Sequence, residues 1–272
     1  MIQNKIDFAV IFTVKNANPN GDPLGGNRPR TTSDGLGEVS DVCLKRKIRN
    51  RLQEMGNEIF VQSDENNNDG KKSLSERYNS FVSKDEQKNK SIVAEKVCGK
   101  WLDVRSFGQV FAFKKGEDAD EVSLGIRGPV TIQSAFSFEP ITVESIQITK
   151  SVNSETTKDG KKSSDTMGMK HRVNKAVYIT YGSISPQLAE KTGFSDEDAE
   201  KIKESLLTLF EGDESSARPS GTMSIQKLIW YKHNTKSGQY SSAKVHDSIK
   251  IDKDGNVTIA ALDGLVPEII EG

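Results

Sequence analysis

Apolar side chains alternate with other residues near the start of the chain, and this pattern predicts a β-strand. Between residues 5 and 14, one face of an extended backbone carries Ile6, Phe8, Val10, Phe12 and Val14. Ala9 and Ile11 stand on the other face, so both faces contain apolar residues. Strands of this kind usually lie inside a sheet, and we expect this one to be central.

A basic helix is predicted after this strand. Apolar residues recur at the spacing of one helix face at Leu44, Ile48, Leu52 and Met55. Ser40 or Asp41 can cap the start of this helix. Five residues between positions 41 and 54 are basic and two are acidic, and we expect the positive charge to lack neutralising partners one turn away. An ordinary solvated charged face is the alternative.

The next part of the chain predicts an insertion and then a strand. Residues 57–92 are polar and rich in Asn, Lys and Ser, which indicates an insertion with small helices. In the following apolar run, Arg105, Phe107, Gly108 and Val110 match positions of the RNP1 signature of RNA-recognition motifs. We expect a strand here whose apolar residues, Phe107, Val110, Phe111 and Phe113, lie in the core. Arg105 and Gln109 are the residues that this strand would present outward.

The second half predicts strands, a hairpin and an acidic helix. After residue 128, a strand is expected to alternate through Val130, Ile132, Ser134, Phe136 and Phe138. Residues 139–181 predict a long β-hairpin with its tip at residues 153–165, and such a hairpin is marginally stable in water without a partner. Ser195 and Asp198 have the spacing of a capping pair at the start of an acidic helix. Residues 224–231 and 256–261 predict later strands.

The stretch of residues 16–30, NANPNGDPLGGNRPR, is dominated by Asn, Gly and Pro. Pro withholds a backbone donor and Gly costs ordering entropy, so a long regular element is excluded here. Gly21, Gly25 and Gly26 would let backbone N–H groups approach a ligand, and Arg28 and Arg30 could hold an anion. A turn-rich connection without a ligand is the alternative.

The composition is that of a soluble protein. The 272 residues include 34% hydrophobic and 28% charged residues, and no apolar run approaches the ~20 residues needed to cross a bilayer. We therefore expect a cytoplasmic protein without a membrane partner. Cys43 and Cys98 are too few for a disulfide framework and are expected to be reduced and buried. The three histidines are too scattered to indicate a metal site or a triad.

The net charge of −1 hides a strong segregation of charge. Residues 150–175 contain seven basic and three acidic residues, in addition to the basic helix. Residues 190–214 contain three basic and nine acidic residues. A nearly neutral chain with two basic segments and an acidic helix can bind a polyanion on one side only.

Five segments resemble the family of repeated backbone subunits of the type I CRISPR surveillance complex (Cascade), most closely its type I-C members, in the RAMP superfamily. They are NPNGDPLGGNRPR (18–30), DVCLKRKIRNRL (41–52), DVRSFGQVFAF (103–113), RGPVTIQSAFSFEPI (127–141) and GMKHRVNKAVYITYG (168–182). The resemblance implies an α+β fold with a ferredoxin-like, RRM-like palm (βαββαβ) in one domain, residues 1–272. It also implies a fingers insertion, residues 57–92, and a thumb hairpin, residues 139–181.

The resemblance further implies a prokaryotic antiviral function. Copies of the chain would polymerise along one CRISPR RNA and present it for pairing with target DNA. Large, small and crRNA-end-capping subunits would be the other partners. The resemblance implies no catalysis, no metal and no cofactor.

The candidate RNA-binding residues come from four segments. The loop contributes Asn18, Asn20, Gly21, Gly25, Asn27 and Arg28, and the basic helix contributes Lys45, Arg46 and Arg49. Arg105 and Gln109 come from the segment that matches RNP1. The hairpin contributes Lys150, Met167, Met169, Lys170, His171 and Arg172, with Met167 or Met169 as the wedge at a displaced nucleotide.

A metal-dependent endoribonuclease is the alternative function. Related backbone subunits of type III complexes cut target RNA with an acidic residue in the loop after the first strand, where this chain has Asp22 and Asp34. Metal-assisted phosphoryl chemistry needs carboxylates close together. A lone Asp in a turn-rich loop more often caps or forms a turn.

Overall fold

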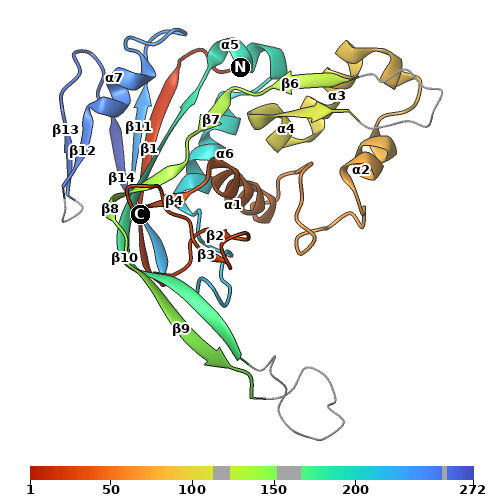
Figure 1. Ribbon diagram of the computed structural model, residues 1–272. Helices are drawn as coiled ribbons and strands as arrows, with labels where there is room; N and C mark the ends of the chain where they lie inside the picture. Colours follow the sequence, from red (N-terminus) through yellow and green to blue (C-terminus); the bar gives the residue numbers. More distant parts are fainter. Residues whose placement is uncertain (113–122, 152–166, 253–255) are drawn as a thin grey trace, which may run out of the picture.

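The computed structural model describes residues 1–112, 123–151, 167–252 and 256–272, which form an α+β fold around a large antiparallel sheet (Figure 1). The strands are β1 (Ile6–Ala17), β2 (Gly21–Asp22), β3 (Arg28–Pro29), β4 (Leu36–Val39), β5 (Gly108–Phe111), β6 (Leu124–Arg127), β7 (Val130–Ile132), β8 (Ala135–Pro140), β9 (Val143–Thr149), β10 (Met167–Ile184), β11 (Met223–Lys232), β12 (Ile249–Ile251), β13 (Val257–Ile259) and β14 (Glu268–Glu271). The helices are α1 (Asp41–Glu54), α2 (Leu74–Phe81), α3 (Lys90–Lys100), α4 (Leu102–Phe107), α5 (Pro186–Thr192), α6 (Asp196–Leu207) and α7 (Ser242–Asp247), with a 3-10 turn η1 at Glu86–Lys88. No helix among these residues is long and apolar enough to span a membrane.

The main sheet has the strand order β14-β11-β1-β10-β8-β4, and β7 and β9 also pair with β10. β1 lies between β10 and β11 and is antiparallel to both. This confirms the prediction of a central first strand. It also explains why both faces of β1 are apolar, since each face is covered by another layer.

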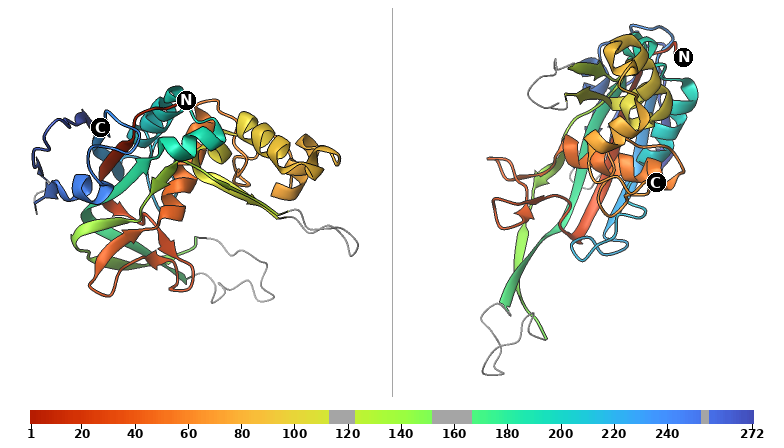
Figure 2. Two further views of the ribbon diagram at one scale, coloured as in Figure 1. Left: turned by 90° about the horizontal axis from the view of Figure 1, so that it is seen from above. Right: turned by 90° about the vertical axis from the view of Figure 1, so that its right-hand side faces the viewer.

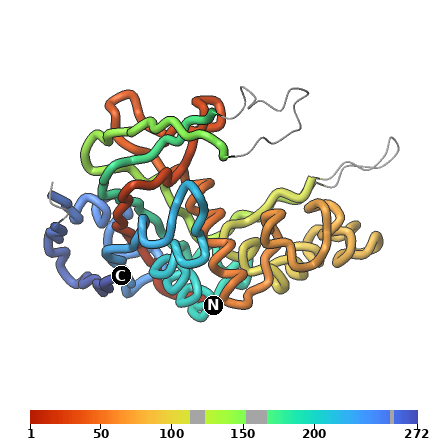
Figure 3. Tube along the Cα trace, turned by 90° about the horizontal axis from the view of Figure 1, so that it is seen from below, coloured from red at the N-terminus to blue at the C-terminus, as the bar shows by residue number. Residues whose placement is uncertain are grey.

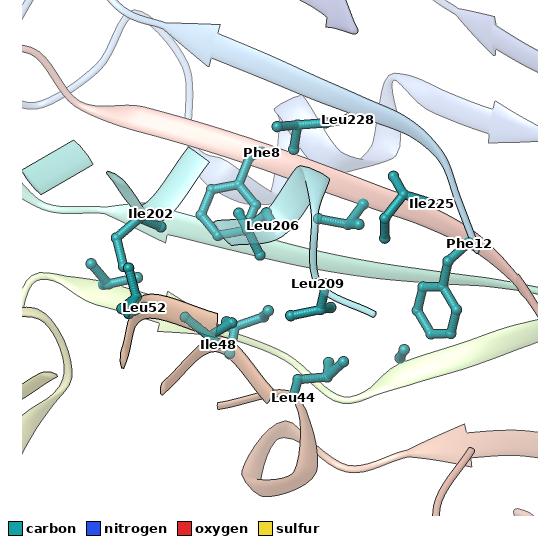
Figure 4. Close-up of a cluster of buried hydrophobic side chains, with 14 of the residues drawn as sticks. Phe8, Phe12, Leu44, Ile48, Leu52, Ile202, Leu206, Leu209, Ile225 and Leu228 are labelled. Atoms are coloured by element: carbon teal, nitrogen blue, oxygen red, sulfur yellow. The ribbon is translucent and has the colours of Figure 1, made fainter. Parts of the chain in front are cut away.

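One face of the sheet is covered by α1 and α6 (Figure 4). The buried residues labelled there include Phe8 and Phe12 from β1, Leu44, Ile48 and Leu52 from α1, and Ile202 and Leu206 from α6. Phe12 also stacks on Tyr178 of β10, with ring centroids 5.3 Å apart. Each such buried side chain contributes about 1.5–3 kcal/mol, so this layer holds both predicted helices on the sheet.

The opposite face of the sheet is partly covered by α7 and the β12–β13 hairpin, which lie on the other side of the sheet from α1 in Figure 1. Ala9 and Ile11 of β1 pack there with Ile229 and Tyr231 of β11 and with Val245 of α7. The sheet therefore separates two hydrophobic layers.

A second hydrophobic cluster lies beside the sheet and is built partly from residues of the predicted insertion (Figure 2, left). Its buried residues run from Phe60 to Phe111, and Leu124 and Ile126 of β6 pack against it. Trp101 contacts Phe60 with ring centroids 4.7 Å apart. The cluster thus continues beyond residue 92.

The prediction of a palm strand at residues 105–113 is wrong. Arg105 and Phe107 belong to α4, and Gly108, with φ at 79°, ends that helix. β5 then pairs with β6 in a separate two-stranded sheet. Phe111 is buried in the second cluster, Phe107 packs against the main core from α4, and Val110 is 62% exposed. The RNP1 match therefore has no counterpart in the main sheet.

The strand predicted after residue 128 forms as two short strands, β7 and β8, and its alternation is wrong beyond Ile132. Val130 and Ile132 are buried, but the next buried positions are Ala135 and Ser137. Phe136 and Phe138 are 39% and 43% exposed. The break between β7 and β8 shifts the inward positions by one residue, which turns these two rings to the other face.

The long hairpin is confirmed. β9 pairs with the outer half of β10 from Val143↔Val173 to Thr149↔Met167. This hairpin arm, residues 143–149 and 167–173, projects from the body of the molecule (Figure 2, right). Its predicted tip lies outside the described residues.

Candidate nucleic-acid interface

The loop of residues 16–30 is a defined turn. Its β2–β3 ends pair at Gly21↔Pro29 and Asp22↔Arg28. The backbone oxygen of Asp22 accepts hydrogen bonds from Gly25 N at 3.1 Å and Asn27 N at 2.8 Å. Its side-chain Oδ1 accepts one from Leu24 N at 3.2 Å. These bonds hold the tip of the loop in one conformation.

Two of the three loop glycines serve the turn itself. A Cβ at Gly21 would lie 1.9 Å from Oδ1 of Asn27, and a Cβ at Gly25 would lie 2.9 Å from Oδ2 of Asp22. Gly26 has φ of 67° and open space around it. Of the three glycines, therefore, only Gly26 has open space where a Cβ would stand. The sequence had predicted such an open backbone at all three.

The loop is anchored to the start of α1 and to its own base. Oδ1 of Asn20 accepts hydrogen bonds from the backbone N and the hydroxyl of Ser40, both at 3.0 Å. Ser40 in turn caps α1 by accepting from Cys43 N. Asn18 is 3% exposed, and its Nδ2 donates to Asn27 O at 2.7 Å. Asn18 and Asn20 thus shape the loop and point inward.

Arg28 links the loop to the hairpin arm. Its Nη1 donates to the hydroxyl of Ser145 in β9 at 3.2 Å, and the same hydroxyl lies 2.9 Å from Nδ1 of His171 in β10. Figure 3 shows the loop beside the arm, on a different side from the second cluster. Two predicted residues, Arg28 and His171, are therefore brought together although they are far apart in the chain.

The arm carries different chemistry on its two faces. Directly opposed residues share a face, so His171 with Ser145, Met169 with Gln147 and Met167 with Thr149 lie on the face that Arg28 touches. Met167 and Met169 are 65% and 54% exposed. The face of the arm that Arg28 contacts therefore carries two thioethers and an imidazole.

The other predicted residues of the arm lie on its opposite face or at its end. Lys170 and Arg172 alternate with the methionines, and Arg172 forms an ion pair of 2.9 Å with Glu144. Lys150 follows the end of β9 and is exposed. Lys170 and Arg172 of the hairpin therefore lie on the opposite face of the arm from its two methionines.

The basic residues of α1 are engaged inside the molecule. Lys45 pairs with Asp41 one turn earlier at 3.0 Å, contrary to the expected lack of such partners. Arg46 donates to the backbone oxygen of Val61 at 2.7 Å. Burial, and then the positive charge of Arg49, lower the pKa of the Arg46 guanidinium. Arg46 thus ties α1 to a neighbouring segment, whereas the ion pair of Lys45 lies within α1.

Asp103 organises this junction and was not predicted. Its carboxylate is fully buried and accepts hydrogen bonds from Phe60 N at 2.7 Å, Val61 N at 3.1 Å and Nε of Arg49 at 3.0 Å. The Arg49 guanidinium also lies 5.1 Å from the centre of the Phe107 ring. The one signal in the sequence is an acidic residue within the apolar run at residues 101–104.

Arg105 and Gln109 are not brought together with the loop. Arg105 forms a two-point ion pair with Asp198, at 2.9 and 2.8 Å, and its side chain is 17% exposed. Burial acts to raise the pKa of Asp198, but the hydrogen bonds from Arg105 and Ser195 outweigh it and lower that pKa. The outward presentation predicted for Arg105 is therefore wrong, because this buried carboxylate neutralises it. Gln109 lies in β5, within the second cluster's small sheet.

The segment after α6 contacts the base of the loop, and the sequence did not predict this contact. Lys47 is 4% exposed and forms an ion pair with Asp213, which Arg218 also contacts at 2.8 Å. Burial is the main cause that lowers the pKa of Lys47, opposed by Asp213. Asn18 N donates to the oxygen of Ala217 at 2.9 Å. Lys47 is thus a buried support and not part of an exposed positive face.

The chain is similar to proteins of known family in sequence and in fold. A family model described as CRISPR-associated protein Cas7 matches residues 4–263. A protein of Haloferax volcanii with the same description is 23% identical over 279 residues, covering 98% of this chain and 81% of that protein. A chain of a CRISPR RNA-guided surveillance complex in a pre-nicking state shares the fold with a TM-score of 0.53 and 17% identity, over 92% of this chain and 82% of that chain. A second such complex gives a TM-score of 0.50 with 17% identity, over 93% and 77%.

Proposed function

The chain belongs to the CRISPR-associated Cas7 family, and from this membership we propose that it is a non-catalytic, RNA-binding backbone subunit of a type I-C surveillance complex. Several copies would bind side by side along one CRISPR RNA and leave its bases free to pair with target DNA. The other subunits of the complex would bind at the ends and along the flank of this assembly. The similarity of the fold to chains of RNA-guided surveillance complexes supports this proposal.

Within this proposal, the main sheet is a ferredoxin-like palm. The strand order β11-β1-β10-β8, with α1 after β1 and α6 after β10, fits a βαββαβ unit whose fourth and first strands are adjacent. The second cluster takes the place of the fingers, and the hairpin arm takes the place of the thumb. Each of these is an excursion from the palm.

The observation that carries the proposal is the contact between the loop and the arm. Arg28, His171 and two exposed methionines lie on one side of the molecule. A guanidinium binds phosphate oxygens through charged hydrogen bonds, independently of base sequence. An unbranched, polarizable methionine can wedge between bases. Asn18, Asn20, Gly21 and Gly25 contribute by holding the turn that positions Arg28.

The test is RNA affinity as a function of salt. Arg28→Ala should lower the affinity about tenfold for guides of any sequence, and should reduce the slope of log K against log salt by about one, because one phosphate contact is lost. Lys236→Ala, which removes a surface cation paired with Glu190, is the matched control and should leave both quantities unchanged. Equal effects of the two substitutions, or a loss that depends on guide sequence, would overturn this assignment.

The nuclease alternative receives less support from the loop. The Asp22 carboxylate accepts a hydrogen bond from Leu24 N and lies 3.6 Å from the Arg30 guanidinium, so it is used in building the turn. Asp34 lies in the turn before β4. Guide-loaded protein incubated with complementary RNA and a divalent metal should leave that RNA intact. Cleavage that Asp34→Ala abolishes would replace the scaffold function with the nuclease.

A further inference from the structure

Two groups that can carry positive charge converge on one hydroxyl between the loop and the hairpin arm (Figure 3). Nη1 of Arg28 donates to Oγ of Ser145 at 3.2 Å, and Nδ1 of His171 lies 2.9 Å from the same oxygen. The two nitrogens are therefore no farther apart than two hydrogen bonds laid end to end. Arg28 and Ser145 are exposed and His171 is half-buried, so a ligand can reach all three side chains.

On the loop side, the nearby carboxylate is used within the turn. Asp22 stands directly opposite Arg28 in the β2–β3 pair. Its carboxylate lies 3.6 Å from the Arg30 guanidinium and accepts a hydrogen bond from Leu24 N at 3.2 Å. Within the described residues, the Arg28 guanidinium has no carboxylate partner and contacts only the neutral hydroxyl of Ser145.

On the arm side, the other charged groups lie away from the imidazole. Glu144 stands on the opposite face from His171 and forms an ion pair with Arg172 at 2.9 Å. Lys170 lies on that opposite face as well. On the face that contacts Arg28, His171 is the one titratable group among the described residues of the arm. No carboxylate of the described arm therefore neutralises a positive charge at this site.

The single hydroxyl hydrogen of Ser145 decides which groups can donate to an anion. A neutral His171 ring that accepts at Nδ1 takes up this hydrogen. A protonated ring has no acceptor and donates from Nδ1 instead, so the Ser145 oxygen accepts from both cations and its hydrogen becomes free. Protonation therefore gives the site an additional donor as well as an additional charge.

An anion between these groups favours the protonated ring. Two cations beside one hydroxyl repel each other, and a negative charge placed between them offsets that repulsion. A phosphodiester carries one negative charge and accepts charged hydrogen bonds through its oxygens. Histidine changes charge close to physiological pH, so a nearby phosphate can decide whether the ring is protonated there.

We propose that Arg28, Ser145 and His171 bind one phosphodiester group of the RNA, and that His171 takes up a proton as the RNA binds. The inference rests on the proposed function and adds a regulation of that site by pH. The proton comes from the solvent and leaves both ring nitrogens carrying hydrogen. No covalent bond of the RNA forms or breaks.

The first test measures affinity for a short oligouridylate, whose bases do not titrate between pH 6 and 8, at constant ionic strength. The wild-type chain should bind about tenfold more tightly at pH 6 than at pH 8, because uptake of one proton changes affinity by up to about tenfold per pH unit. His171→Gln keeps a hydrogen-bonding side chain but cannot be protonated, and its affinity should change less than about twofold. His246→Phe removes a histidine of α7 and is the matched control, which should retain the wild-type change.

The outcomes separate the inference from the proposed function. Wild-type affinity that does not change with pH overturns the inference and leaves the RNA-binding proposal standing. A pH dependence that His171→Gln retains also overturns it, because another group then takes up the proton. A wild-type chain that binds no oligouridylate at any pH defeats the proposed function and the inference with it.

The second test counts the proton by isothermal titration calorimetry at pH 7. The enthalpy of binding the same oligouridylate is measured in two buffers with different heats of ionisation. For the wild-type chain, the difference should correspond to between about half and one proton taken up per bound RNA, and it should vanish in His171→Gln. Equal enthalpies in the two buffers for the wild-type chain, or the same difference in both proteins, overturn the inference.

Discussion

At the scale of single residues, a few buried carboxylates decide what the cations do. Asp103, Asp198 and Asp213 each hold one or two basic side chains, and two of these carboxylates are less than 5% exposed. A cation bound in this way is fixed in place and joins distant segments of the chain. By contrast, the exposed Arg28 side chain donates to a neutral hydroxyl, that of Ser145.

Loss of the Asp103 carboxylate should destabilise the fold. Asp103→Ala leaves the Arg49 charge and the N–H groups of Phe60 and Val61 without their partner, so the free energy of unfolding should fall by about 3 kcal/mol. Asp85→Ala, which breaks a solvent-exposed pair with Lys88, should change it by less than about 0.5 kcal/mol. Urea titration measures both, and equal losses would contradict the role given to Asp103.

Substitution of Gly21 should disrupt the turn. Gly21→Ala places a Cβ against the side chain of Asn27 and 3.2 Å from Nδ2 of Asn18, so these side chains must shift within the turn. RNA affinity should fall several-fold while the melting temperature changes little. Gly26→Asn is the matched control, because its surroundings are open and Asn tolerates positive φ. RNA affinity that responds equally to both substitutions would show that the turn geometry does not matter.

The residue scale also marks the limit of prediction from sequence. Arg28 and His171 were each named from the sequence, but their proximity was not predicted. Both contact Ser145, which is 117 residues from Arg28 and 26 residues from His171. Asp103 and Asp198 neutralise Arg49 and Arg105 from 54 and 93 residues away. Local charge counting cannot detect such partners.

At the scale of elements, periodicity predicted those that pack against the main core. β1, α1, α6 and β11 follow strong apolar patterns, and all four contribute to the same hydrophobic cluster. The capping pair of Ser195 and Asp198 was also confirmed. The failures are the segment at residues 105–113, which divides between α4 and the separate β5–β6 sheet, and the shift between β7 and β8. Both failures depend on which hydrophobic core a residue faces. Periodicity alone does not carry that information.

The packing of α7 on the sheet should depend on pH through His246. Its ring stacks on Tyr181, its Nε2 lies 3.4 Å from Gly182 O and 4.0 Å from Asp7, and Lys5 and Asp247 are the other charges that act on it. Burial, the largest cause, lowers the pKa of His246 despite the opposing effect of Asp7. The folded state therefore binds this proton less readily than the unfolded state does.

The free energy of unfolding should accordingly be highest above the ordinary histidine pKa of about 6.5 and should fall as the pH drops below it. His246→Phe should reduce this slope, because the residue no longer titrates. Gln147→Ala, on the hairpin arm, is the control and should retain the wild-type slope, because it removes no titratable group. Chemical unfolding between pH 7.5 and 5 measures it, and identical slopes in all three proteins would contradict the account.

At the scale of the whole molecule, the loop and one face of the arm bring a cation, an imidazole and two methionines together on the α1 side of the sheet. These are the groups that we propose contact RNA. Removal of the arm's outer part should spare the folded body and weaken cooperative assembly on RNA.

The most direct test of the central claim is the number of copies bound per RNA as the RNA is lengthened, measured by native mass spectrometry. We expect the number to rise in single steps at a constant number of nucleotides per copy, independently of sequence. No bound RNA, or one copy bound whatever the length, would contradict the account.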